Sequence, residues 1–210
     1  MPNYSKSDIR YTIRDEDFKK MVNRTSGIEH KAFLAILYCT GARPSEISGD
    51  NIRGLKGMTV GDIRFWERDV SFFVPVSKIR QHIYSVEKRQ LTLEFDPGKI
   101  DYAIEIIIKF LEHKIKESQR ESKNENVDFD KPLFDFSRKT GYNIVSRASQ
   151  YIGKEICPYN FRHSRLTQLS EQGAGLETLM YFKGSKNIRS IQTYLHARNI
   201  KYKLNKDEPR

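Results

Sequence analysis

The sequence predicts one mainly helical α+β domain with a small antiparallel sheet near its N-terminal third. Apolar residues recur at helical spacing along most of the chain, and the segments rich in β-branched and aromatic residues are concentrated between residues 60 and 95. A chain of 210 residues is long enough for one substantial core. Internal repeats and low-complexity linkers are absent from the sequence, so we expect a single domain.

The first elements are helices. Three acidic residues at positions 15–17 open a helical segment, where they complement the positive end of the helix dipole. Residues 28–39 predict a second helix with a broad apolar face. Gly41 ends that pattern, and Pro44 suits the first turn of a short third helix.

The sheet follows these helices. Residues 60–63, 70–76 and 90–95 have the composition of strands, and the turns between them are polar and basic. We therefore expect three short antiparallel strands, with a basic turn between the second and the third.

The second half of the chain returns to a helical pattern. Residues 101–121 predict a long helix with a face of isoleucine and leucine side chains. The highly charged residues 117–130 predict an exposed, mobile loop. Short helices are expected at residues 142–152, 161–171, 176–182 and 188–196, separated by Gly173, Gly175 and Gly184.

The charge of the chain favours a polyanionic partner. The net charge is +10, and residues 138–210 hold 14 of the 37 Lys and Arg but only 5 of the 27 Asp and Glu. Cys39 and Cys157 are isolated and lack metal-ligand spacing, which is typical of a reduced, cytoplasmic protein. The sequence has neither a signal-peptide pattern nor an apolar stretch of the roughly 20 residues that span a membrane.

Three residues point to a reaction at a phosphodiester. The guanidiniums of Arg43 and Arg162 can hold the two non-bridging oxygens of a phosphate, and the phenol of Tyr194 can attack its phosphorus. A metal cluster of carboxylates does not stand out, so the positive charge would come from fixed side chains without a metal or another cofactor.

Around these residues the chain resembles the tyrosine recombinase, or phage integrase, family. Residues 40–47 (Thr-Gly-Ala-Arg-Pro-Ser-Glu-Ile) are similar to its first signature box. Residues 161–164 (Phe-Arg-His-Ser) and 192–196 (Gln-Thr-Tyr-Leu-His) are similar to its second. Arg162 precedes Ser185 by 23 positions and Tyr194 by 32, which matches the spacing common in the family.

The resemblance implies a site-specific DNA recombinase or integrase that cleaves and rejoins DNA strands through a covalent 3′-phosphotyrosine. It makes Arg43 and Arg162 the phosphate clamp and Tyr194 the nucleophile. The family's general acid is a lysine on a hairpin turn. Lys78 fits that position best, and Arg80 and Lys88 are the nearby alternatives.

Two further residues are predicted to support the site. Glu46 lies one helical turn after Arg43 and can brace its guanidinium, although a surface ion pair would have the same spacing. His163 follows Arg162 as in many members of the family, where it supports the site rather than catalyses. A neutral, packed imidazole is the alternative for His163.

The chain departs from the family pattern at two predicted catalytic positions, which archaeal and viral branches are known to vary. Tyr159 and Ser185 stand where the family usually has histidine and His or Trp. Tyrosine is a poor base at neutral pH, whereas serine can still donate to a phosphate oxygen. Lys183 and Lys186 could supply positive charge, and we predict that they and Arg80 contact DNA.

The predicted organisation is an N-terminal extension (1–14), a recombinase catalytic domain (15–198) and a basic tail (199–210). Family members usually begin with a separate DNA-binding arm, so this sequence is either a fragment or a form with the catalytic domain alone. The implied partners are double-stranded DNA and, on the DNA, further copies of the protein, with a tetramer expected.

Three alternatives stay open at this point. Tyr159 and Ser185 motivate a catalytically weakened or inactive DNA-binding regulator with the same fold. A type IB topoisomerase-like enzyme would share the chemistry, and a helix-turn-helix regulator would leave Arg43 and Tyr194 unexplained. An enzyme requires Arg43, Lys78, Arg162 and the Tyr194 hydroxyl around one pocket. A Tyr194 that is buried in the core, with no mobile segment to bring it out, favours the regulator.

Overall fold

The structure is a computed structural model that describes residues 11–76, 88–95, 101–122, 127–185 and 187–194. Within these ranges the helices and strands are α1 (Asp15–Arg24), α2 (Ile28–Thr40), α3 (Pro44–Ser48), β1 (Ile63–Phe65), β2 (Asp69–Pro75), β3 (Lys88–Glu94), α4 (Tyr102–Ser122), α5 (Arg138–Gln150), α6 (Pro158–Glu171) and α7 (Leu176–Lys183). Short 3₁₀ turns lie at η2 (Asn51–Arg53), η3 (Val60–Asp62) and η4 (Ile188–Ser190).

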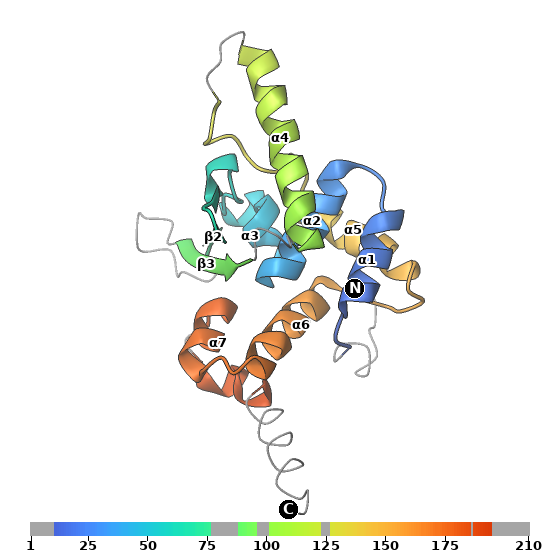
Figure 1. Cartoon of the computed structure of the whole chain (residues 1–210), viewed down its shortest axis with the longest axis vertical. Coiled ribbons are helices and arrows are strands. Elements are labelled where there is room, and N and C mark those ends of the chain that lie inside the picture. Colours follow the sequence, from blue (N-terminus) through green and yellow to red (C-terminus); the bar gives the residue numbers. More distant parts are fainter. Residues whose placement is uncertain (1–10, 77–87, 96–100, 123–126, 186, 195–210) are drawn as a thin grey trace, which may run out of the picture.

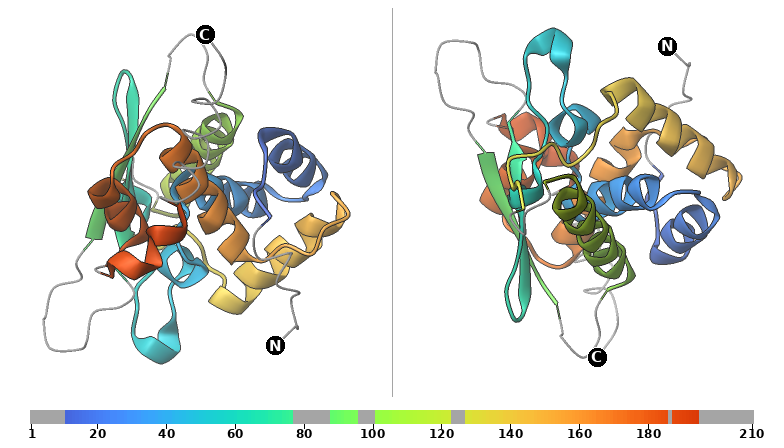
Figure 2. Two further views of the ribbon diagram at one scale, coloured as in Figure 1. Left: turned by 90° about the horizontal axis from the view of Figure 1, so that it is seen from below. Right: turned by 90° about the horizontal axis from the view of Figure 1, so that it is seen from above.

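Helix α2 is the centre of the core. Its side chains from Ala32 to Leu37 are fully buried, because the helix is apolar on every side and packs against α1, α4, α5 and α6. Figures 1 and 2 show α2 inside the molecule, with these helices around it. A helix that is buried all round fixes the position of the segment after it, and that segment contains Arg43.

The sheet has the order β1-β2-β3 and is antiparallel throughout. Its register pairs Ile63 with Phe72, and Pro75 with Lys88. In β3 the side chains of Arg89 and Leu91 point to the buried face, whereas their neighbours are exposed. The strand therefore carries an arginine into the interior.

Helices α6 and α7 form a second group below the sheet and α2 in Figure 1. Helix α6 packs on α2, and the Tyr181 hydroxyl of α7 accepts a hydrogen bond of 3.0 Å from the Gln90 backbone N–H of β3. The two groups meet where α2, α3 and β3 face α6 and α7. None of the helices in the described part of the chain is both long and apolar enough to cross a bilayer.

The predicted fold class is confirmed, since the structure is mainly helical with one small antiparallel sheet. The strand predicted at residues 60–63 is wrong. Val60–Asp62 forms a 3₁₀ turn instead, because the Asp62 carboxylate accepts a 2.8 Å hydrogen bond from the Thr59 backbone N–H. The chain becomes extended only at Ile63.

The mobile loop predicted from residue 117 is also wrong at its start, because α4 continues to Ser122. Buried Lys114 pairs with Glu117 of the same helix at 3.3 Å and with Glu29 of α2 at 3.1 Å. The pair with Glu29 ties the middle of α4 to α2, and the pair with Glu117 lies within α4 itself. Of the helix predicted at 188–196, the structure has η4 and a helical turn at 192–194, and the remainder lies outside the described residues.

Candidate active site

Arg43 occupies the turn between α2 and α3. Gly41 ends α2 in the left-handed conformation with φ of +59°, and a Cβ on it would lie 3.2 Å from the Arg162 Cα atom. Pro44 then starts α3 with Arg43 as its N-cap residue. This turn therefore brings Arg43 close to α6, which carries Arg162.

The Glu46 side chain binds Arg43 at two points. The Arg43 backbone N–H donates to Glu46 Oε2 at 2.9 Å, and the Arg43 Nη1 donates to Glu46 Oε1 at 2.6 Å. The Glu46 side chain is fully buried, whereas 29% of the Arg43 side chain is exposed. The Arg43 side chain therefore reaches the surface, whereas the carboxylate that holds it does not.

Two more guanidiniums approach the same carboxylate. Arg89 Nη2 donates to Glu46 Oε2 at 2.8 Å, and Arg162 Nη1 lies 4.0 Å from that oxygen. Burial acts to raise the pKa of Glu46, but the charges of Arg89, Arg162 and Arg43 outweigh it and lower the pKa to about 2. Glu46 is therefore ionised at neutral pH despite its burial.

Arg89 is the residue that the sequence analysis missed. Only 4% of it is exposed, and its Nε and Nη1 have no hydrogen-bond partner among the described residues. Gly184 has φ of +58°, and a Cβ there would lie 2.6 Å from Arg89 Nη1. The signal was present in the alternation of β3, because Arg89 shares its buried face with Leu91.

Arg162 is held by backbone carbonyl groups. Its Nη1 donates to the Gly41 carbonyl at 2.7 Å, and its Nη2 donates to the Lys183 carbonyl. Burial and the nearby Arg43 charge lower the pKa of Arg162 to about 10, although Glu46 acts in the opposite direction. The guanidinium therefore stays charged at neutral pH.

We call the side chains of Arg43, Glu46, Arg89 and Arg162 the arginine cluster. Together they carry three positive charges and one negative charge, which leaves two positive charges in excess in a largely buried place. A low-dielectric environment strengthens the attraction of such an excess for an anion. Guanidiniums match the oxygens of a phosphate in geometry as well as in charge.

Tyr194 is only 4% exposed, and it lies close enough to Arg162 of this cluster for that charge to act on its pKa. Its hydroxyl is 3.4 Å from His163 Nδ1, and the Lys183 Nζ lies 5.5 Å from the centre of its ring. Burial and the hydrogen bond to Tyr159 raise the pKa of Tyr194 above its usual value, while Arg162 acts to lower it. The phenol is therefore protonated at neutral pH.

The burial of Tyr194 is the feature that we expected of an inactive regulator. However, its hydroxyl does not lie among apolar side chains alone, because it meets His163 and Tyr159. Tyr159 stands in the first turn of α6 and is 46% exposed. The hydroxyl thus lies in a polar environment that reaches the surface at Tyr159.

The other predicted residues divide into three groups. Ser185 follows Gly184 and lies 3.2 Å from the Ser190 hydroxyl, so it belongs to the turn after α7. Lys88 pairs with Asp62 at 2.6 Å, and it points to the face of β3 opposite to that of Arg89. Lys78, Arg80 and Lys186 lie outside the described residues.

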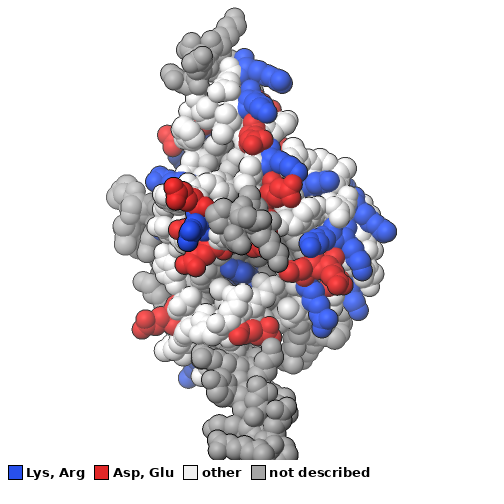
Figure 3. All heavy atoms as spheres, in the orientation of Figure 1, with Lys and Arg blue, Asp and Glu red and all other residues white. Residues whose placement is uncertain are grey.

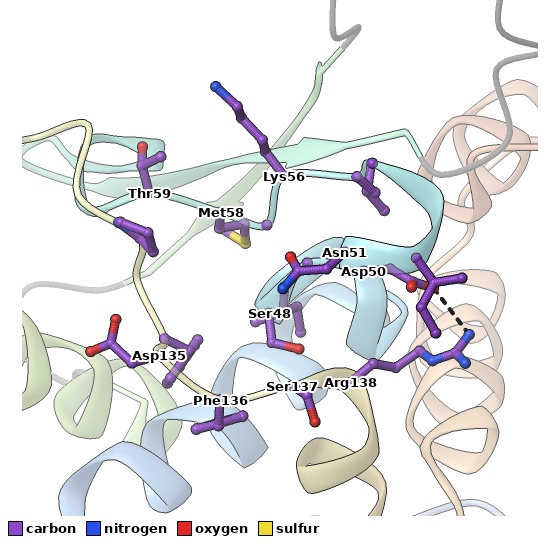
Figure 4. Close-up of a pocket in the computed structure, with 18 of the residues that line it drawn as sticks. Ser48, Asp50, Asn51, Lys56, Met58, Thr59, Asp135, Phe136, Ser137 and Arg138 are labelled. Atoms are coloured by element: carbon purple, nitrogen blue, oxygen red, sulfur yellow. Dashed lines mark ion pairs between the residues drawn. The ribbon is translucent and has the colours of Figure 1, made fainter.

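The structure also contains a cavity of about 890 Å³ between residues 47–59 and 130–139. Figure 4 shows Asp50 and Arg138 at one side of this cavity, joined by an ion pair of 3.2 Å. The cavity lining includes none of the arginine cluster. Within the described ranges, no group of three His, Cys, Asp or Glu side chains is arranged to hold a metal ion.

The sequence model of the phage integrase family matches residues 12–200. The chain belongs to this family. The tyrosine recombinase XerD of Chlorobaculum tepidum is 32% identical over 188 residues, which cover 88% of this chain and 54% of that protein. The chain therefore spans about half the length of this relative.

Two solved structures share the fold. The XerA recombinase has a TM-score of 0.62 at 15% identity, over 100% of this chain and 68% of that one. The XerH recombinase in its post-cleavage complex with palindromic difH substrate also has a TM-score of 0.62 at 15% identity, over 99% and 55% of the two chains. This likeness confirms the predicted recombinase catalytic-domain fold.

Proposed function

We propose that this chain is the catalytic domain of a site-specific DNA recombinase that cleaves and rejoins DNA through a 3′-phosphotyrosine. The observation that carries the proposal is the position of Tyr194 next to the arginine cluster, in a chain of the phage integrase family. The proposal covers the predicted catalytic domain at residues 15–198, with 1–14 as an extension and 199–210 as a basic tail.

The arginine cluster binds the scissile phosphate. Arg43 offers its exposed part and Arg162 its remaining N–H groups to the two non-bridging oxygens. Charge builds on these oxygens when the phosphorus is attacked, and fixed guanidiniums stabilise it without reorganisation. Glu46 orients Arg43, and its pairing with Arg89 keeps the carboxylate ionised.

Cleavage exchanges one ester bond for another. The Tyr194 oxygen forms a bond to phosphorus while the bond from phosphorus to the 5′-oxygen breaks, and Lys78 gives that oxygen a proton. The phosphotyrosine conserves the energy of the broken bond, so a 5′-hydroxyl can reseal the strand without a nucleotide cofactor. Because Tyr194 is buried here, DNA must expose its hydroxyl before the attack.

Double-stranded DNA is the proposed partner. The XerH recombinase is bound to a difH substrate, and the Tn1549 transposon integrase, which has a TM-score of 0.52, is in complex with transposon right end DNA. These complexes support DNA as the ligand of the shared fold. On the face in Figure 3, Lys and Arg gather on the side of α1 and α5, with acidic residues among them. We further propose that the DNA is contacted by Arg80, Lys183, Ser185 and Lys186. Several copies of the protein assemble on the DNA, with a tetramer expected. The reaction takes place in the cytoplasm.

The test is a covalent adduct on a nicked suicide duplex, whose site is first selected by binding from a pool of randomised duplexes. Wild-type protein is expected to form an adduct that resists denaturing electrophoresis, and Tyr194→Phe is expected to bind the same DNA without forming one. DNA binding by the wild type without an adduct would favour the alternative, a catalytically inactive DNA-binding regulator.

A further inference from the structure

We propose that His163 is the catalytic residue that takes the proton from the Tyr194 hydroxyl. This inference rests on the proposed function, and it gives His163 a direct part in the reaction instead of a supporting one. It also explains how the chain works with a tyrosine at position 159, where the family usually has a histidine.

The geometry of α6 places two side chains at one hydroxyl. Tyr159 and His163 are four residues apart, so they lie on the same face of the helix, one turn from each other. Tyr159 hydrogen-bonds the Tyr194 hydroxyl, and His163 Nδ1 lies 3.4 Å from the same oxygen. A histidine one turn further along the helix therefore reaches the same atom.

Of the groups that the structure describes around Tyr194, only the imidazole of His163 can take a proton at neutral pH. The Arg162 guanidinium and the Lys183 ammonium have donors but no acceptor. A phenol such as that of Tyr159 accepts a hydrogen bond but holds a second proton too weakly to act as a base. A neutral imidazole with its proton on Nε2 presents a lone pair at Nδ1.

Tyr194 needs such a base. Its pKa is raised by burial and by Tyr159, so the attacking oxygen carries a proton when the DNA arrives. The distance of 3.4 Å is longer than the 2.6–3.2 Å typical of a working general base. Such contacts commonly shorten when the substrate is bound, and the two rings are already adjacent, with centres 5.4 Å apart.

The proposed step is balanced in both directions. In cleavage the bond from Tyr194 Oη to phosphorus forms, the bond to the 5′-oxygen breaks, the proton on Oη moves to His163 Nδ1, and Lys78 protonates the 5′-oxygen. In rejoining, the 5′-hydroxyl attacks and returns its proton to Lys78. The His163 imidazolium then returns its proton to the departing Tyr194 oxygen.

The experiment separates activation of the nucleophile from protonation of the leaving group. Adduct formation is measured with His163→Asn and Lys78→Ala on two suicide duplexes, one normal and one with sulfur in place of the bridging 5′-oxygen. A sulfur leaving group departs without a proton, so Lys78→Ala should form the adduct on the sulfur duplex at a rate close to that of wild type. The sulfur duplex should not restore His163→Asn, which is expected to be slower than wild type by about 10²–10⁴-fold on both duplexes.

Controls and a second variant isolate the base. His113→Asn changes an exposed histidine of α4 and should cleave at the wild-type rate. Raising the pH should increase the rate of His163→Asn more than that of wild type, because solvent then removes the Tyr194 proton. Adding Tyr159→His to His163→Asn puts an imidazole one turn earlier, at the same hydroxyl, and should restore cleavage.

Three results would overturn the inference. The first is cleavage by His163→Asn within about twofold of the wild-type rate on the normal duplex. The second is rescue of His163→Asn by the sulfur duplex, which would place its action at the leaving group. The third is a pH profile of His163→Asn that is parallel to that of wild type, together with no recovery of cleavage when Tyr159→His is added. That result would mean that His163 has only a structural role. The absence of any Tyr194-dependent adduct with wild-type protein would instead overturn the proposed function itself.

Discussion

Two buried charge clusters in this protein are opposite in sign. The arginine cluster surrounds one carboxylate, Glu46, with three guanidiniums. At the other cluster, the buried ammonium of Lys114 is surrounded by Glu29, Glu117 and Asp135 at 3.1–3.3 Å. Both have one central charge and three partners of the opposite sign.

The clusters differ in the exposure of those partners. The three carboxylates around Lys114 have side chains that are 39–65% exposed, so water solvates their excess negative charge. In the arginine cluster, only 4% of the Arg89 side chain and 6% of the Arg162 side chain are exposed. An excess charge that water cannot reach favours a bound counter-ion. The Lys114 cluster therefore holds α4 in place, and the arginine cluster is suited to bind a phosphate.

The largest expected effect is at the centre of the arginine cluster. Glu46→Gln keeps the shape of the side chain but leaves buried guanidiniums without their counter-charge, which should lower the free energy of unfolding by about 3–5 kcal/mol. Urea unfolding at pH 7 measures it. A loss below about 1 kcal/mol would mean that water reaches the cluster and would remove the contrast with Lys114.

Acidification tests the same carboxylate without a mutation. Because the pKa of Glu46 is lowered from 4.5 to about 2 in the folded protein, its contribution is complete above pH 4.5 and is lost as the pH falls toward 2. The loss should be about 3 kcal/mol for this group. The free energy of unfolding, measured between pH 6 and pH 2, should fall by this amount in the wild type and by less in Glu46→Gln. An equal fall in both proteins would exclude Glu46 as the source of the pH dependence.

Gly184 tests whether Arg89 is held by close packing. Gly184→Ala and Gly153→Ala both put a side chain at a positive φ, which costs about 1–2 kcal/mol. Only at Gly184 would the new Cβ meet Arg89, because no atom lies within 4 Å at Gly153. Overpacking should therefore destabilise Gly184→Ala by about 1–3 kcal/mol more than Gly153→Ala in thermal unfolding. Similar values for both would show that Arg89 moves aside freely.

The smallest effect is expected at the Lys114 cluster. Glu117→Gln removes one solvated partner and leaves Glu29 and Asp135, so the free energy of unfolding should change by less than about 1 kcal/mol. The change should shrink further in high salt, because the carboxylate is exposed. A loss comparable to that of Glu46→Gln would mean that the exposure of the partners does not decide the behaviour of a buried charge cluster.

Local patterns in the sequence predicted most elements of the fold. Helix α2, the Gly41 turn and the start of α3 at Pro44 were predicted because their signals lie within a few adjacent residues. The prediction failed at η3, where the Asp62 side chain competes with strand formation. It failed again where residues 117–122 were assigned to a mobile loop, because α4 continues to Ser122, in agreement with the helix predicted at residues 101–121.

The site shows the same division. Arg43, Arg162 and Tyr194 were found from the motifs around them, but Arg89 was not. The alternation of β3 places Arg89 on the buried face, but its pairing with Glu46, 43 positions away, is visible only in the folded chain. The contact between His163 and Tyr194 joins residues 31 positions apart. Sequence position predicted His163 as a support, and its distance from the Tyr194 hydroxyl became visible only in the folded chain.

By itself, the sequence determined which chemical groups this protein can bring to a reaction, since two arginines and a tyrosine stand in family motifs at family spacing. It also determined the helices and two of the strands, because hydrogen bonding and side-chain periodicity act over short stretches of chain. Only the tertiary structure decided that Arg89 joins the arginine cluster and that His163 meets Tyr194. Electrostatic interactions depend on distance and burial in space, and both are set when α2, β3 and α6 pack together.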